Sequence, residues 1–354
     1  MPLRRLIPPV LAAVVLGAVA CNDLPTSAPI WKTTWILPVQ QDTIGVAQLL
    51  PSTVDTAGGQ FLITLDRDSV QQTLGSMCPS CGADQGNVAP VSGFTYGVSH
   101  TDAFPAQVVS ITPGGFALSY RIDNGLNFDP LRPGVGKIGS IVTQVKDGNG
   151  NVVATDSVNG STASFPSGTS LTRSIALGTS PIAGGLTLVA TFRVPTTDPV
   201  PVDTAERVQV TTLTDTATLA GVTVQLTSQS IQSDSVDVDW SNIDSDVQSR
   251  MQGAALKLVM DNPFTISGTG SVRFKQGIRD VIPAKTVTFA AGSTTNTIDI
   301  TASEIRTLIA AGPSTITIDA SVAGTGPGNS VAITPSQLVL IDAHVLVTIV
   351  VGGK

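Results

Sequence analysis

The chain has few charged, aromatic and histidine residues, and these shortages narrow the classes of function open to it. Charged residues make up 13% of the 354 residues and aromatic residues 4%, and there are two histidines. Enzymes that move protons usually rely on histidine or on a buried carboxylate, so this composition gives catalysis little support. The sequence also lacks G-x-S-x-G, H-E-x-x-H and a glycine-rich phosphate loop. We therefore expect neither an enzyme nor a bound cofactor.

No run of lysine or arginine is present. The formal net charge is −7, and the isoelectric point is near 4.7. A nucleic-acid surface needs clustered cations that displace phosphate counterions, so nucleic acid is excluded as a partner. The acidity is spread thinly along the chain, which is typical of an exported protein kept from self-association.

The residue types that are abundant in the chain favour β-structure. Hydrophobic residues reach 42% with 34 glycines and 23 prolines, and the mean hydropathy is +0.28. Short segments of alternating apolar and polar residues are separated by turn signals, with no regular alternation of strands and helices. This pattern predicts an all-β chain of antiparallel sandwiches.

One strand pattern occurs twice, as GFALSYRIDN at 115–124 and GAALKLVMDN at 253–262. In both copies alternate apolar residues face one side, and the final asparagine is a turn signal. Later residues match as pairs: Phe165 with Phe289, Gly168 with Gly292, Leu188 with Ile318, Ala190 with Ala320, Val208 with Leu338 and Val210 with Leu340. We predict two tandem, internally repeated, immunoglobulin-like β-sandwich domains, over 30–214 and 215–354.

Several local features are expected inside these domains. The glycine- and proline-containing stretch 66–105 is predicted to be a loop-rich insertion in the first domain. The capping-box pattern at 301–304 predicts a short helix, and the apolar run 338–351 predicts a central strand. Trp31 and Trp35 alternate on a strand at 30–37, which predicts a buried aromatic strand or, as the alternative, a pair that contacts carbohydrate or lipid.

The N-terminus carries the one long apolar run outside the strands. Two arginines precede an apolar stretch that ends at Ala20 and is too short to span a bilayer comfortably, so 1–20 is predicted to be a signal peptide. The residues Ala-Val-Ala-Cys at 18–21 resemble the lipobox of bacterial lipoproteins, with Ala18 where leucine is commoner. The same residues also fit an ordinary A-x-A cleavage site and simple secretion.

The lipoprotein resemblance implies that Cys21 is the lipidation site, acylated with palmitate-type chains, and is the first mature residue. Residues 21–29 then form the lipidated cysteine and a tether that ties the protein to a membrane. Asn22 stands where aspartate would direct inner-membrane retention, so the resemblance implies the cell envelope, at the outer membrane, facing the periplasm or the cell surface.

With Cys21 acylated, Cys78 and Cys81 remain as a C-x-x-C pair. Because an even number of cysteines remains in an oxidising compartment, we expect the two to form a disulfide, which would fix a local turn. A zinc site that adds His100 and His344, and a redox pair, are the alternatives. Haem attachment is excluded because glycine follows Cys81.

Two acidic segments raise the question of calcium. Asp147-Gly-Asn-Gly-Asn151 resembles part of a calcium loop, but its Asn-Gly pair is the signature of a hairpin turn. Asp237 and Asp239 alternate with apolar residues and are predicted to share the solvent face of a strand, where a calcium site is the alternative. We predict no metal site.

The two histidines are interpreted as structural. His100 is expected to be a solvated loop residue that Asp102 orients, and this pair is the one acid–base couple a hydrolase might use. His344 is expected to be a satisfied histidine within a sheet.

Binding, adhesion or an envelope-structural role is the function we expect. A carrier of an apolar, lipid-like ligand held between the sheets is the alternative, followed by a hydrolase. The segment 256–264, with Asn262-Pro263, is similar to the strand with Asn-Pro in water-stress (late-embryogenesis type) β-sandwich domains. That resemblance covers one strand and implies only the sandwich fold.

Overall fold

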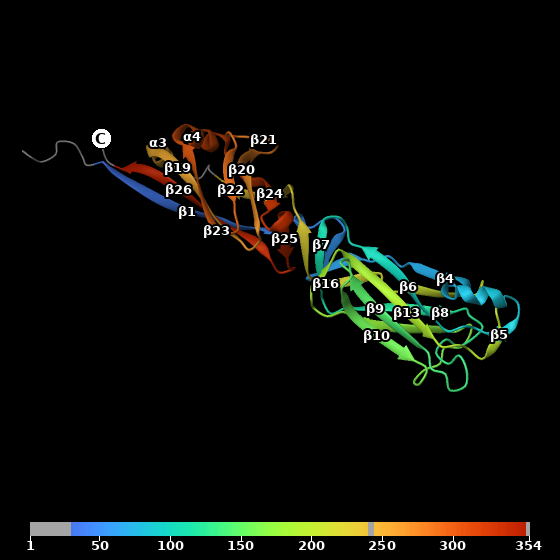
Figure 1. The fold of residues 1–354 in the computed structure, drawn as a ribbon. Helices are drawn as coiled ribbons and strands as arrows, with labels where there is room; N and C mark the ends of the chain where they lie inside the picture. Colours follow the sequence, from blue (N-terminus) through green and yellow to red (C-terminus); the bar gives the residue numbers. More distant parts are fainter. Residues whose placement is uncertain (1–29, 240–243, 352–354) are drawn as a thin grey trace, which may run out of the picture.

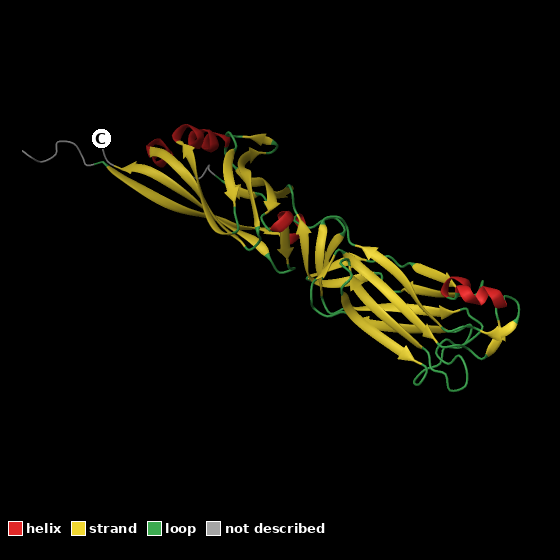
Figure 2. Cartoon of the chain, viewed as in Figure 1, coloured by secondary structure: helices red, strands yellow, loops and turns green. Residues whose placement is uncertain are grey.

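The protein is all-β, and two sandwiches lie end to end in an elongated molecule (Figures 1 and 2). The structure, a computed structural model, describes residues 30–239 and 244–351. The predicted signal peptide and Cys21 lie outside these residues. No helix in the described part of the chain is long and apolar enough to cross a membrane.

The first sandwich consists of two four-stranded antiparallel sheets whose strands alternate buried and exposed residues. One sheet has the order β10 (Val152–Asn159), β9 (Ser140–Asp147), β13 (Gly185–Val194) and β6 (Phe94–Ala103). The other has the order β11 (Ser170–Ala176), β8 (Ala117–Asn124), β15 (Arg207–Thr212) and β4 (Ser69–Thr73).

The second sandwich repeats this arrangement. Its first sheet has the order β1 (Trp31–Gly45), β26 (Leu338–Val351), β19 (Met251–Asn262) and β23 (Gly292–Thr301). Its second sheet contains β17 (Gln229–Gln232), β18 (Val236–Val238), β24 (Ser314–Gly324), β20 (Ile266–Gln276), β21 (Arg279–Asp280) and β22 (Lys285–Phe289). The predicted capping box is confirmed, because Thr301 and Glu304 cap α4 (Ala302–Ala311), and α3 spans Ser245–Arg250.

A further sheet joins the two sandwiches. It has the order β12 (Ile182–Ala183), β7 (Val108–Pro113), β16 (Thr216–Gln225), β3 (Gln60–Thr64) and β2 (Val54–Ala57). From the second repeat, β25 (Ser330–Ile333) also pairs with β16. The two repeats therefore share a sheet, and the predicted boundary at 214/215 falls next to a strand that both repeats use.

Asn124 and Asn262, which end the two copies of the repeated pattern, make equivalent hydrogen bonds in the two domains. Asn124 and Asn262 are each 1% exposed. The side-chain oxygen of each accepts the backbone N–H two residues on, from Leu126 and from Phe264, at 3.0 Å. Each side-chain amide donates to a backbone carbonyl distant in sequence, that of Phe165 after β10 at 2.8 Å or that of Ala290 after β22 at 2.9 Å. Because these polar groups are buried, the bonds fix the exit of β8 and of β19 in the same way.

One part of the predicted match is wrong by a single residue. Val208 and Val210 are buried, but Leu338 and Leu340 are 39% and 45% exposed. Val339 and Ile341 are the buried residues of this part of β26, and Ile341 lies opposite Met260 of β19. In a strand, a slip of one residue moves every side chain to the other face, so the repeats correspond here at an offset one residue longer. The prediction of a central strand is confirmed, because β26 lies between β1 and β19.

Two predicted boundaries need correction. The segment 30–37 was assigned to the first domain, but β1 pairs along its length with β26, so it belongs to the second sandwich. The segment 66–105 was expected to be loop-rich, but β4 and β6 lie within it as edge strands of the first sandwich. Both errors concern pairings between strands distant in sequence, which local patterns do not record.

Candidate functional site

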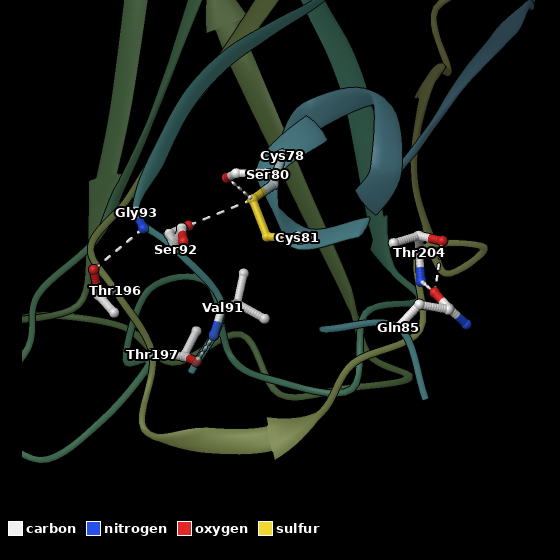
Figure 3. Close-up of a disulfide and its surroundings, with 10 residues drawn as sticks. All are labelled: Cys78, Ser80, Cys81, Gln85, Val91, Ser92, Gly93, Thr196, Thr197 and Thr204. Carbon is white, nitrogen blue, oxygen red and sulfur yellow. Dashed lines mark hydrogen bonds between the residues drawn. A yellow bond between two sulfur atoms is a disulfide. The ribbon is translucent and has the colours of Figure 1, made fainter. Parts of the chain in front are cut away.

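The end of the molecule opposite the C-terminus carries an excursion of the chain between β4 and β6. It contains α2 (Leu74–Met77), the 3₁₀ helix Pro79–Asp84 and β5 (Val88–Pro90), which pairs with β14 (Pro199–Pro201). Cys78 and Cys81 form a disulfide within it. The predicted disulfide is therefore present in the structure and pins one short turn (Figure 3).

The disulfide turn packs against residues 91–93, the link between β5 and β6. The Sγ of Cys78 lies 3.7 Å from the carbonyl oxygen of Ser92. The next residue, Gly93, donates its N–H to the Oγ1 of Thr196 at 3.2 Å, and Val91 donates to the Oγ1 of Thr197 at 2.8 Å. As Figure 3 shows, these bonds fasten the excursion to the segment before β14. The position of Gly93 is thus fixed from both sides.

The loop between β8 and β9, residues 125–139, lies against the same segment. Asp129 accepts backbone N–H groups from Leu131 and Phe165, at 2.8 and 2.7 Å. Asp198 accepts the backbone N–H of Val135 at 3.0 Å and the ammonium of Lys137 at 2.7 Å. These contacts lower the pKa of Asp198, chiefly through the bond from Lys137. Carboxylates therefore hold the loop in one conformation.

This fixed loop presents apolar side chains to solvent. Val135 is 94% exposed and Ile138 is 59% exposed. Two glycines keep the loop close to the body, because a Cβ on Gly139 would lie 2.0 Å from the carbonyl oxygen of Pro130, and one on Gly160 would lie 1.9 Å from that of Leu131. An ordered surface loop with outward apolar side chains is typical of binding loops.

A groove of about 470 Å³ lies between this loop and the adjoining strands. Its lining combines apolar side chains, two hydroxyl groups and one guanidinium: Gly93, Phe94, Thr95, Ile138, Ser140, Arg193, Val194 and Pro195. We call the groove together with loop 125–139 the distal tip. The exposed lining of this shallow groove is mostly polar, so it offers hydrogen-bonding groups beside the apolar Val135 and Ile138 of the loop.

The other edge of the first sandwich is closed by a polar cluster. Asp156 on β10 receives two hydrogen bonds from Arg173 on β11, at 2.8 and 2.6 Å, and one from the hydroxyl of Tyr120 on β8 at 3.0 Å. The bonds from Arg173 lower the pKa of Asp156, and burial raises the pKa of Tyr120 to about 12. The cluster ties the two sheets together, and we assign it a structural role.

His100 was expected in a solvated loop, but it lies on β6 with a side chain only 12% exposed. Its Nε2 lies 3.1 Å from Asp102 and its Nδ1 lies 3.6 Å from Asp68. Because a carboxylate faces each ring nitrogen, neither is directed to a substrate hydroxyl. This geometry does not favour a general base.

The structure shows whether the residues of the alternative zinc site come together. The zinc set of Cys78, Cys81, His100 and His344 is not assembled, since both thiols are in the disulfide. Over residues 30–239 and 244–351 no three Cys, His, Asp or Glu side chains gather as a metal site. His344 lies on β26 with its Nε2 at 3.5 Å from Asp342, but its buried Nδ1 has no hydrogen-bond partner, so the prediction of a satisfied histidine is wrong at that atom.

The Asp147 segment forms the predicted hairpin turn between β9 and β10. The carboxylate of Asp147 accepts the N–H groups of Asn149 and Asn151 and the side-chain amide of Asn151, at 2.9, 2.7 and 2.9 Å. These bonds, chiefly that from the Asn151 amide, lower its pKa. Asp237 and Asp239 lie on the exposed face of their segment, as predicted.

Trp31 and Trp35 are exposed and not buried. Trp31 is 65% exposed and Trp35 is 49% exposed, so the prediction of a buried aromatic strand is wrong. They lie on β1, the edge strand of its sheet. The strand extends beyond the body of the sandwich together with the end of β26 (Figure 1).

The alternative function, a carrier of an apolar ligand, requires a cavity between the sheets of a sandwich. A cavity there, lined mainly by β19, β24 and β26, holds about 20 Å³. This volume suits a single water molecule and not an acyl chain. Asp42 lines the cavity, and burial raises its pKa.

The distal tip is not evident in the sequence because its residues come from three separate segments, 93–95, 125–140 and 193–195. One local signal was present: the run NFDPLRPGVGKIG at 127–139 combines turn-forming residues with the apolar Val135 and Ile138. Apolar residues within such a run are candidates for display on a surface.

No protein-family model matches the chain, and no curated protein matches it. A solved structure titled a "putative secreted protein" from Parabacteroides distasonis aligns with 89% of this chain and 99% of its own, at 9% identity and a TM-score of 0.35. The structure of infectious bursal disease virus, Gx strain, aligns with 93% of this chain and 81% of its own, at 13% identity and a TM-score of 0.18.

Proposed function

We propose that the chain is an exported lipoprotein, held in the cell envelope through acylated Cys21, that binds a macromolecular partner at its distal tip without catalysing a reaction. The observation that carries this proposal is the placement of the two ends. The strand that follows the tether, β1, lies at one end of an elongated body, and the distal tip lies at the other (Figure 1). An anchor at one end holds the opposite end away from the membrane.

Three features support binding over the alternatives. Hydrogen bonds fix the apolar loop at the tip, so little conformational entropy is lost when a partner orders it. The carboxylates around His100 disfavour a hydrolase. The small cavity of the second sandwich disfavours a carrier of acyl chains.

Site-specific photocrosslinking in cells that export the full chain tests the binding role. A photoreactive residue at position 135 or 138 is expected to give discrete crosslinked products. The matched control is position 278, where Ile278 is 103% exposed on the second sandwich. If the tip positions give no product beyond that of position 278, the tip has no binding role.

Membrane attachment is tested in the same cells. The wild-type chain is expected to partition into the detergent phase of a detergent–water separation, and Cys21→Ala to remain in the aqueous phase. Equal partitioning of the two would contradict the anchor.

A further inference from the structure

The tip of the β1–β26 strand pair, residues 30–36 with residues 347–351, exposes apolar side chains on both of its faces. We call it the proximal tip. Trp31 pairs with Val351 and Trp35 with Val347, and the neighbouring Ile36 is 65% exposed. Among the described residues, Trp31 and Trp35 are the aromatic residues whose side chains are exposed to solvent. A soluble surface rarely gathers such residues without a use for them.

We propose that the proximal tip lies in the interfacial region of the bilayer to which the protein is anchored, with Trp31 and Trp35 at the headgroup level. This inference rests on the proposed anchor at Cys21 and adds a contact between the protein body and the lipid. Tryptophan is favoured at a membrane–water interface because its ring is largely apolar and its indole N–H still reaches polar partners.

The length of the tether restricts where the tip can be. Eight residues, 22–29, separate Cys21 from Ile30. Fully extended, this stretch reaches about 30 Å at most, which is comparable to the thickness of a bilayer core. An acylated Cys21 lies at the membrane surface, so the first residues of β1 lie within about 30 Å of that surface.

The charge of the tip also suits a lipid surface. The whole chain has a net charge of −7. Within 30–41 and 343–351, by contrast, Lys32 is the one Asp, Glu, Lys or Arg residue. Anionic headgroups attract a lysine and would repel the acidic side chains found elsewhere on the protein. The strand pair nearest the anchor thus carries no Asp or Glu within these ranges that anionic lipid would repel.

A second copy of the chain is the competing occupant. Because β1 is an edge strand, its unpaired backbone groups could pair with those of another molecule. Such pairing would shield the tryptophans from water without placing them in lipid. A quencher confined to the acyl chains distinguishes the two cases.

The test uses the full chain, expressed with its own N-terminal segment and reconstituted into vesicles of phosphatidylethanolamine and phosphatidylglycerol. The vesicles contain phosphatidylcholine brominated high on one acyl chain. Trp31 and Trp35 are two of the three tryptophans, so we expect bromine to quench up to about two thirds of the emission. Trp31→Phe with Trp35→Phe should abolish the quenching, whereas Trp240→Phe should retain it.

Each outcome is decisive. Absence of bromine quenching overturns the bilayer contact, and a blue-shifted emission without quenching assigns the tip to a second copy. The mass of the N-terminal peptide from the same preparation reports acylation separately. An acylated protein without quenching refutes only the tip contact, whereas an unacylated protein refutes the anchor.

Discussion

At the scale of single residues, one buried asparagine in each sandwich and one charged cluster in the first sandwich hold strands and loops together. Asn124 and Asn262 each satisfy backbone groups that would otherwise be buried without partners. Asp156 joins both sheets through Arg173 and Tyr120. These contacts are specific enough to be tested one at a time.

Replacing the repeated asparagines should destabilise the protein to different extents. Asn124→Ala leaves the carbonyls of Phe128 and Phe165 and the N–H of Leu126 without partners, which should cost about 2–4 kcal/mol of unfolding free energy. Asn262→Ala removes two bonds and should cost about 1–3 kcal/mol. Denaturant unfolding measures both, with the exposed Asn87→Ala as control. Equal, negligible losses would contradict the capping role.

The Asp156 cluster should make stability depend on pH in the acid range. The pKa of Asp156 is lower in the folded protein than its ordinary value of 3.8, so the carboxylate favours folding above that pH. Its contribution is lost as the pH falls through the folded pKa. We expect Asp156→Asn to be less stable than the wild type at pH 7 and to approach it as the pH falls below 3.8 and through the lowered folded pKa. A constant difference from pH 7 to pH 2, measured by urea unfolding, would rule this out.

At the scale of elements, the disulfide and β1 each stabilise one region. Cys78 and Cys81 close a short loop, so the bond restricts few conformations of the unfolded chain. The strand β1 instead places Ile44, which is 1% exposed, in the core of the second sandwich.

Removing the disulfide should therefore have a local effect. Cys78→Ser with Cys81→Ser is expected to cost about 2 kcal/mol and to leave the sheets intact. Limited proteolysis should become faster within 74–93, and Ser80→Ala, which keeps both cysteines, serves as control. Loss of the folded near-ultraviolet spectrum in the double variant would show a larger role than the loop length allows.

The position of β1 gives a test of domain membership. Ile44→Ala should cost about 2–4 kcal/mol and should speed hydrogen exchange in β26 and β19. Exchange in β8 of the first sandwich should not change. The exposed Thr43→Ala is the matched control. Faster exchange in β8 instead would place β1 in the first domain, as its sequence position suggests.

The sequence predicted the elements that carry their own local signal. The alternation before Asn124 and Asn262, the capping box at Thr301 and the turn at Asn149 were each sufficient to place an element. The partner of β1 was not predictable in this way, because pairing with β26 joins opposite ends of the chain. The strand β6 was missed because Gly97 and polar residues interrupt its apolar pattern. The distal tip requires Asp129 and Asp198 to meet separate segments, which only tertiary structure reveals.

At the scale of the whole molecule, two sandwiches that share a sheet form an elongated body with different ends. The proximal tip has exposed tryptophans, and the distal tip has a fixed apolar loop beside a groove. The proposed function assigns the first to the membrane and the second to a partner. Both assignments depend on Cys21.

The most direct test of this account is the mass of the N-terminal peptide of the mature protein, isolated from membranes of a bacterium that expresses the full chain. The account predicts a peptide that begins at Cys21 and carries the added mass of a diacylglyceryl group, with or without a further acyl chain. A peptide that begins at Cys21 with an unmodified thiol, or one that begins at another residue, would contradict it.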